Sequence, residues 1–160
     1  MFTCVAWATD GSEHSDRALP YAVRLAVESG APLHAIHVAE HLLTGRAAGQ
    51  YVRADEQERE AKIERQLATA GESVTVAMHR ASNLEGPVAK VIGRIAEEAG
   101  ADVLVVGSRG HGALAGAALG SVTQHLLHDA HCPVLSIGPS VTAAAVATED
   151  SGEPAVTPSA

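Results

Sequence analysis

Five glycines occupy residues 107–120, between an apolar run and a predicted helix. Three of them follow the spacing Gly107-x2-Gly110-x9-Gly120-Ser121. A glycine has no Cβ, so a ligand can approach its backbone closely, and the free N–H groups at a helix N-terminus attract anions. The amides of Gly120, Ser121 and Val122 would point out of this N-terminus. The spacing indicates a phosphate-binding loop, and the alternative is that the glycines only permit tight turns.

Polar side chains in and after this loop can add to anion binding. Ser108, Arg109 and His111 lie within the loop, and the guanidinium of Arg109 suits a charge-assisted hydrogen bond to a phosphate. Ser121 is a favourable N-cap, and Gln124 completes the S-x-x-Q pattern of a capping box. An exposed loop arginine or histidine often has no special role, so these side chains are candidates only.

Two other phosphate-binding patterns fit poorly. A P-loop needs a lysine after its last glycine, and neither Lys62 nor Lys90 follows a glycine. Gly110, Gly112 and Ala115 match the dinucleotide pattern G-x-G-x-x-G/A, but that pattern follows the first strand of a domain and opens a helix at once. The next predicted strand also lacks the acidic residue that would bind a ribose. Both patterns are therefore disfavoured.

Apolar runs alternate with helical patterns along the chain. The predicted strands are Thr3–Ala8, Leu33–Ala39, Ser73–Arg80, Asp102–Val106 and Pro133–Ile137. The predicted helices run from after the turn Asp10-Gly11-Ser12 to about Ser29, from about Ala54 to Ala70, from Pro87 to just before Gly100 and from Ser121 to Ala130, with a loop at Gly45–Tyr51. Nearly continuous apolar strands that alternate with helices are typical of a parallel sheet covered on both faces. The predicted fold class is therefore α/β, with a single five-stranded, doubly wound parallel sheet.

In such sheets, ligands bind beyond the carboxyl ends of the strands. The turn Asp10-Gly11-Ser12 and the glycine loop both follow a strand, so they share that edge. Pro20 is expected to kink the first helix unless it lies in a first turn.

Composition and charge restrict the classes of partner. The chain has 160 residues, 46% of them apolar, and a formal net charge of -8, which argues against binding to nucleic acid or an anionic membrane. No run of 18 apolar residues and no signal-peptide pattern occurs, so the cytoplasm is the expected location. Residues 1–139 are expected to form one domain, and residues 140–160, rich in Ala, Thr, Ser and Pro, a disordered tail.

Three segments and the glycine spacing together resemble the universal stress protein family, in its subgroup with an ATP-binding motif. GSVTQHLLHDAHCPVLSI is similar to that family's last helix and strand, ATDGSEHSDRAL to its first strand and turn, and HVAE to the end of its second strand. The resemblance covers residues 3 to 138 and implies the strand order 3-2-1-4-5 with helices on both faces.

The resemblance also implies a nucleotide site. Asp10 matches the family's acidic residue after the first strand, implied to bind the ribose or adenine side, and Val38 matches a residue whose backbone meets the adenine. Asp10 could instead serve only its turn, and Val38 only the core. The candidate nucleotide-binding residues are Ala8, Thr9, Asp10, Val38, Gly107, Ser108, Arg109, Gly110, His111, Gly120, Ser121 and Val122.

The expected function is ATP binding by a stress-response or signalling regulator, which changes conformation or partner with nucleotide occupancy. Mg²⁺ would accompany the phosphates, and no protein metal site or catalytic residue is proposed. The alternatives are a sensor of AMP or cyclic AMP, a slow ATPase, and an interaction protein that binds no nucleotide. The resemblance further implies a homodimer through the last strand, Pro133–Ile137, which is an edge of the implied sheet.

Several further residues carry weaker expectations. Trp7 is large for a first strand and is expected either to pack under the nucleotide or to crowd it. The implied strand order puts Cys4 and Cys132 two strand spacings apart, too far for a disulfide, so both thiols are expected to stay reduced. The trio His125, His128 and His131 is interpreted as surface or capping histidines. His34 and His37 fall on opposite faces of a strand and make no pair.

Overall fold

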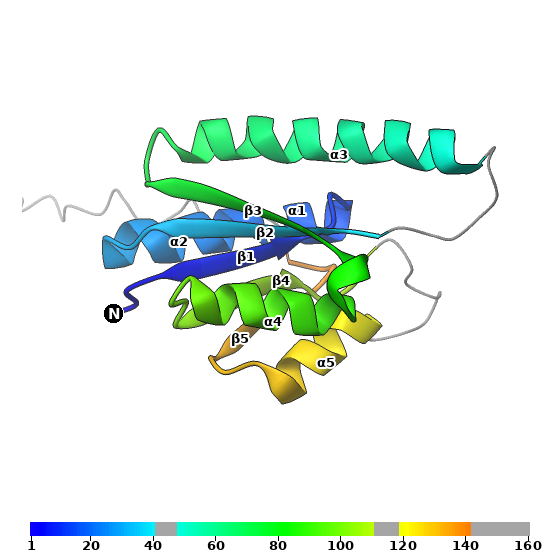
Figure 1. Ribbon diagram of the computed structural model, residues 1–160. Coiled ribbons are helices and arrows are strands. Elements are labelled where there is room, and N and C mark those ends of the chain that lie inside the picture. Colours follow the sequence, from blue (N-terminus) through cyan, green and yellow to red (C-terminus); the bar gives the residue numbers. More distant parts are fainter. Residues whose placement is uncertain (41–47, 111–118, 142–160) are drawn as a thin grey trace, which may run out of the picture.

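A five-stranded parallel sheet forms the centre of the molecule (Figure 1). The computed structural model describes residues 1–40, 48–110 and 119–141, and the side chains of all of these except 48–54. The strands are β1 (Val5–Thr9), β2 (Leu33–Ala39), β3 (Val76–Ser82), β4 (Val103–Gly107) and β5 (Val134–Ile137). Their order in the sheet is β3-β2-β1-β4-β5, which confirms the expected topology.

Helices cover both faces of this sheet. They are α1 (Glu13–Asp16), α2 (Leu19–Ser29), α3 (Ala48–Ala70), α4 (Val88–Glu98) and α5 (Ser121–Asp129), with a 3₁₀ turn, η1 (Asn83–Glu85), before α4. Apolar residues of α2 and α3 join one core cluster, and those of α4 and α5 join a second. Figure 1 shows α3 on one side of the sheet and α4 with α5 on the other.

Successive residues of the central strands point into opposite cores, because side chains alternate along a strand. On β1, Val5 and Trp7 lie in the cluster with α2 and α3, whereas Ala6 and Ala8 lie in the cluster with α4 and α5. Trp7 is fully buried, and its Nε1 donates a hydrogen bond to the backbone oxygen of Ser15 at 3.1 Å. Trp7 therefore packs beneath α1.

The first predicted helix is divided into α1 and α2. Its turns are interrupted at Arg17 and Ala18, and Pro20 then lies in the first turn of α2. Proline is tolerated there because the first helical N–H groups have no intrahelical acceptor. Pro20 therefore lies at the start of a second helix and does not kink the first.

Two predicted boundaries were wrong. Residues 48–51, predicted as part of a loop, belong to α3, because alanine and glutamine favour a helix strongly enough to include Gly49 near its start. The third strand begins at Val76 rather than Ser73. The amides of Ser73 and Val74 both donate to the carbonyl of Ala70, so the chain is still turning off the helix there.

The remaining expectations concern the cysteines, the membrane and the tail. Cys4 and Cys132 are both free thiols, and burial, followed by the nearby Asp102 carboxylate, raises the pKa of each.

Among the described residues, no helix combines the length and the apolar character that a membrane span needs. Residues 142–160 lie outside the described part, so the disordered tail stays a prediction.

Candidate functional site

A cavity of about 450 Å³ opens at the carboxyl edge of the sheet, between the turn after β1 and the loop after β4. Its volume is in the range of small-molecule sites. Most of the residues predicted for a ligand site line it. These are Ala8, Thr9, Asp10, Val38, Gly107, Arg109, Gly110, Gly120, Ser121 and Val122. The structure therefore gathers residues 8–10, residues 107–110 and the start of α5 around one space.

Among the described residues, one predicted site residue, Ser108, is not part of this lining. Ser108 is buried, its backbone N–H donates to Ile137 at 2.8 Å, and its carbonyl accepts from Gly120 at 2.7 Å. Ser108 thus joins β4 to β5 and to the start of α5. His111 lies outside the described residues, and its role stays a prediction.

Two of the loop glycines are required by contacts within the protein. A Cβ on Gly107 would lie 2.4 Å from the backbone oxygen of His14, so α1 could not pack against the end of β4. A Cβ on Gly110 would lie 2.5 Å from Oδ2 of Asp10. Gly110 therefore leaves room for the Asp10 carboxylate beside the loop, and this contact joins the two halves of the cavity.

The start of α5 differs from the prediction by one residue. Gly120 is the N-cap, with extended backbone, and Ser121 is the first helical residue without a side-chain capping bond. The cause is the bond from the Gly120 amide to Ser108, which holds residue 120 extended before the helix. The predicted capping box is therefore wrong, and so is the expectation that the Gly120 amide points outward. Thr123 provides the local side-chain anchor, since its Oγ1 donates to the Gly107 carbonyl at 2.9 Å.

The amides that remain available belong to the first turn of α5. Ser121 and Val122 precede the first residue with an acceptor inside the helix, so their N–H groups and the helix dipole favour an anion. Arg109 lies beside them in the cavity wall, and its buried Nε has no hydrogen-bond partner among the described residues. This end of the cavity suits a phosphate.

The opposite end is formed by the turn after β1. Oδ1 of Asp10 accepts a hydrogen bond from the Ser12 amide at 3.0 Å, and the Gly11 amide donates to Oγ1 of Thr9 at 3.1 Å. Gly11 has a φ of 74°, in the left-handed region that glycine adopts readily. The turn therefore fixes the Asp10 carboxylate at the edge of the cavity.

Sequence reasoning missed the part of the wall that α1, α3, α4 and the end of β2 supply, together with further residues of β4 and α5. The additional lining residues are Ser15, His37, Glu40, Glu56, Arg59, Val88, Ile92, Val106, Thr123 and Leu126. His37 is almost completely buried, its Nδ1 bonds the Thr9 carbonyl at 2.8 Å, and its Nε2 contacts Glu56. Glu56 also lies 3.6 Å from Arg59. The polar residues of the predicted helix did not indicate which side of α3 would pack against the cavity.

Trp7 lies outside the cavity wall, because the alternation of β1 directs it into the opposite core. It therefore neither packs under a ligand in this cavity nor crowds it, contrary to both expectations.

The histidines make separate contacts. His34 and His37 have different partners, since His34 stacks on His79 of β3 with 2.9 Å between Nδ1 and Nε2. His125 contacts the Ser121 carbonyl and His131 the Ala101 carbonyl. Across residues 1–40, 55–110 and 119–141, no three His, Cys, Asp or Glu side chains lie together as a metal site.

The chain is similar to several characterised sequences and structures. The universal stress protein YxiE of Bacillus subtilis is 35% identical over 147 residues, which cover 86% of this chain and 99% of that protein. A universal stress protein of Methanocaldococcus jannaschii is 31% identical over 145 residues, covering 86% of this chain and 82% of that protein. A crystal structure of a universal stress protein in complex with cAMP superimposes with a TM-score of 0.64 at 27% identity, covering 85% of this chain and 97% of that one.

The sheet order and the cavity at its carboxyl edge define a doubly wound α/β protein with a cavity of small-molecule size at the edge where such folds bind ligands. The sequence model of the family described as "Universal stress protein family" matches residues 1–137. The chain belongs to the universal stress protein family.

Proposed function

We propose that this universal stress protein binds an adenine nucleotide in the cavity, with ATP as its ligand and Mg²⁺ accompanying the phosphates. Nucleotide occupancy would change its conformation or its protein partner in the cytoplasm, and so regulate a stress or signalling response. The observation that carries the proposal is that Arg109 and the start of α5 face the Asp10 turn around one cavity.

The proposed phosphate-binding end of the cavity rests on hydrogen-bond donors that the described residues leave unused. The first-turn amides of α5 and the buried Nε of Arg109 can all donate to phosphate oxygens. A chain of phosphates could bond several of these donors together, and the glycine spacing resembles that of the ATP-binding subgroup. The resemblance to the ATP-binding subgroup is the reason for proposing ATP, since the loop glycines alone do not separate a nucleotide with one phosphate from one with three.

The other end suits a nucleoside. The carboxylates of Asp10 and Glu40 can accept hydrogen bonds from ribose hydroxyls or from an exocyclic amine. Val38, Val88 and Ile92 supply apolar wall against which a planar base can pack. The related protein crystallised with cAMP supports an adenine nucleotide as the class of ligand.

Regulation by occupancy is proposed rather than rapid turnover. The cavity wall, as far as it is described, includes no lysine and no arrangement of a nucleophile with a base. We assign no catalytic residue, and slow hydrolysis of ATP is the alternative.

We also propose a homodimer through the last strand. β5 is an edge of the sheet, and no other strand in the described ranges pairs with its outer side. Leu135 is 38% exposed on this edge. An edge strand with an exposed apolar side chain favours pairing with a second copy.

Isothermal titration calorimetry tests the ligand. The full chain is titrated with ATP and Mg²⁺, AMP and cAMP, alongside Arg109→Met and the matched control Arg24→Met, which removes an arginine from the surface of α2. We expect ATP to bind, its affinity to fall about tenfold or more in Arg109→Met, and Arg24→Met to behave as the wild type.

Other outcomes of the titration would indicate a different function. Binding of AMP or cAMP alone would identify an energy or second-messenger sensor. If no nucleotide binds, and none is carried through purification, the chain is an interaction protein and the nucleotide proposal is wrong.

A further inference from the structure

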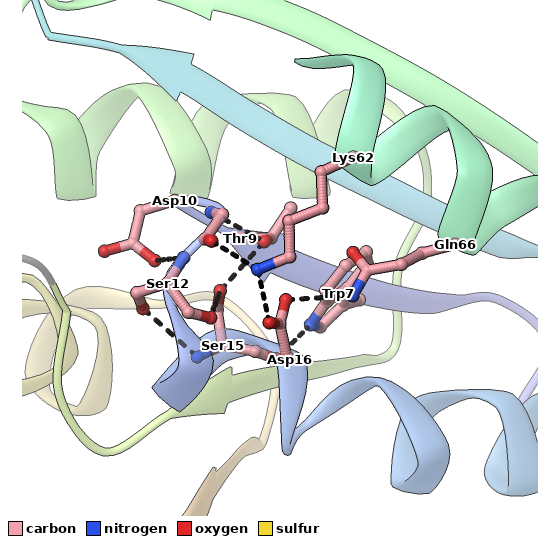
Figure 2. Close-up of polar contacts among 9 residues, drawn as sticks. Trp7, Thr9, Asp10, Ser12, Ser15, Asp16, Lys62 and Gln66 are labelled. Carbon is pink, nitrogen blue, oxygen red and sulfur yellow. Dashed lines mark hydrogen bonds and ion pairs between the residues drawn. The ribbon is translucent and has the colours of Figure 1, made fainter. Parts of the chain in front are cut away.

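The long helix α3 contacts the turn that carries Asp10 through several polar side chains. Nζ of Lys62 donates to the Gly11 carbonyl at 2.8 Å and also contacts the Asp16 carboxylate. Nε2 of Gln66 donates to the other oxygen of Asp16 at 2.9 Å. Figure 2 shows Lys62 reaching from the helix into the turn, between the Asp10 and Asp16 sides. One face of α3 therefore anchors both the turn and α1.

A second contact between α3 and this turn passes through His37. A carbonyl oxygen can only accept, so Nδ1 of His37 donates to the Thr9 carbonyl, while Nε2 contacts Glu56 of α3. Glu56 and Lys62 thus act on the carbonyls of Thr9 and Gly11, the residues on either side of Asp10. The Thr9–Asp10 peptide adjoins the Cα of Asp10, and the Gly11–Ser12 peptide carries the amide that donates to Oδ1 of Asp10, so the two contacts hold the Asp10 side chain from both ends.

The Asp10 carboxylate has little freedom to compensate for a change in this turn. Oδ1 accepts from the Ser12 amide, and Oδ2 lies against the backbone of Gly110. A rotation of the Gly11 peptide would move the Ser12 amide and draw the carboxylate away from the glycine loop. The geometry of the cavity wall therefore depends on how α3 is docked.

We propose that Lys62, together with the His37–Glu56 pair, positions Asp10 for nucleotide binding, so that these particular contacts of α3 with the turn set the affinity of the cavity. Lys62 does not line the cavity; it acts through the Gly11 carbonyl. The part of the inference that concerns affinity rests on the proposed nucleotide function. The part that concerns the geometry of the turn stands without it.

The experiment compares Lys62→Met with Arg80→Met. Arg80 lies on β3 and forms an ion pair with Glu64 of α3, so the control also removes one positive charge from a contact between α3 and the sheet. It leaves the Gly11 carbonyl and the Asp10 turn untouched. If Lys62→Met fails to fold, Glu56→Gln tests the second contact in its place.

The first measurement needs no nucleotide. Hydrogen exchange of the Ser12 amide, followed by NMR, reports the bond to Oδ1 of Asp10. We expect this amide to exchange about tenfold faster in Lys62→Met and at the wild-type rate in Arg80→Met. Unchanged protection of Ser12 in Lys62→Met would overturn the positioning role, whatever the protein binds.

The second measurement is a double-mutant cycle on ATP affinity, with Asp10→Asn as the other change. Lys62→Met alone should weaken binding about tenfold, and by less than about twofold when Asp10 is already replaced. An equal loss in both backgrounds would show that Lys62 does not act through Asp10. Wild-type protein that binds no nucleotide would reject the proposed function, while the exchange of Ser12 still decides the inference.

Discussion

At the scale of single residues, two glycines of the loop have a role within the protein besides the one that their spacing predicts. Gly107 and Gly110 were expected to bring the backbone close to a ligand. In the structure, their missing side chains make room for the His14 carbonyl and for the Asp10 carboxylate. The loop builds the wall of the cavity by allowing distant parts of the chain to touch. Sequence spacing cannot distinguish the two purposes, because each needs a backbone without Cβ.

Gly107 and Gly120 should differ sharply in their tolerance of alanine. Gly107→Ala places a Cβ 2.4 Å from backbone of α1, which cannot move aside like a flexible side chain, and we expect it to lower the free energy of unfolding by about 3 kcal/mol. Gly120→Ala meets its nearest atom at 3.4 Å and replaces only a modest N-cap, at a cost of no more than about 1 kcal/mol. Urea unfolding of the two variants checks this, and equal stabilities would contradict it.

At the scale of the elements, the sequence predicted the sheet well and the docking of α3 poorly. All five strands were recognised from their apolar runs, and Gly30 and Gly100, both with positive φ, mark the ends of the helices before β2 and β4. The side of α3 that contacts the turn is polar, with Glu56 and Lys62 among ordinary surface residues. Lys62 bonds the Gly11 carbonyl and contacts Asp16, and Glu56 contacts His37. No spacing pattern in the sequence links residues this far apart. The helical half of the candidate site was therefore not predictable.

The contact between β2 and β3 should make stability sensitive to acid. Burial, followed by the neighbouring His79, lowers the pKa of His34 below its ordinary value of 6.5. In acid the unfolded chain therefore binds a proton at His34 that the folded chain resists. The contribution to stability is fully present above about pH 6.5 and is lost as the pH falls below it.

The measurement is the urea midpoint at about pH 7.5 and about pH 5.5. The drop between the two should be smaller in His34→Gln than in the wild type. His128→Gln, which changes an exposed histidine of α5, should keep the wild-type drop. A His34→Gln protein as acid-sensitive as the wild type would show that this pair does not contribute.

At the scale of the whole molecule, the two edges of the sheet are unequal. The apolar side chains Val76 and Met78 of β3 are packed against the core cluster that contains Ile63 and Leu67 of α3. β5 is short, and Leu135 is exposed on it. The proposed association of two copies therefore belongs to the β5 edge rather than to β3.

Leu135→Lys tests this association by placing a charge on the β5 edge. Sedimentation equilibrium should give the mass of two chains for the wild type and of one chain for the variant. Val27→Lys, which makes the same change at an exposed apolar residue of α2, should leave the mass at two chains. A wild-type protein that sediments as one chain would reject the dimer.

The single tryptophan of this chain provides a built-in optical probe. Its indole is sealed from solvent and bonded to the Ser15 carbonyl, three residues beyond the Ser12 amide that holds Asp10. The tryptophan fluorescence of this chain therefore comes from a single position, beneath α1 and the turn. A change in wavelength or intensity when nucleotide is added would report movement of that turn without any label, and the full chain can therefore be followed in real time.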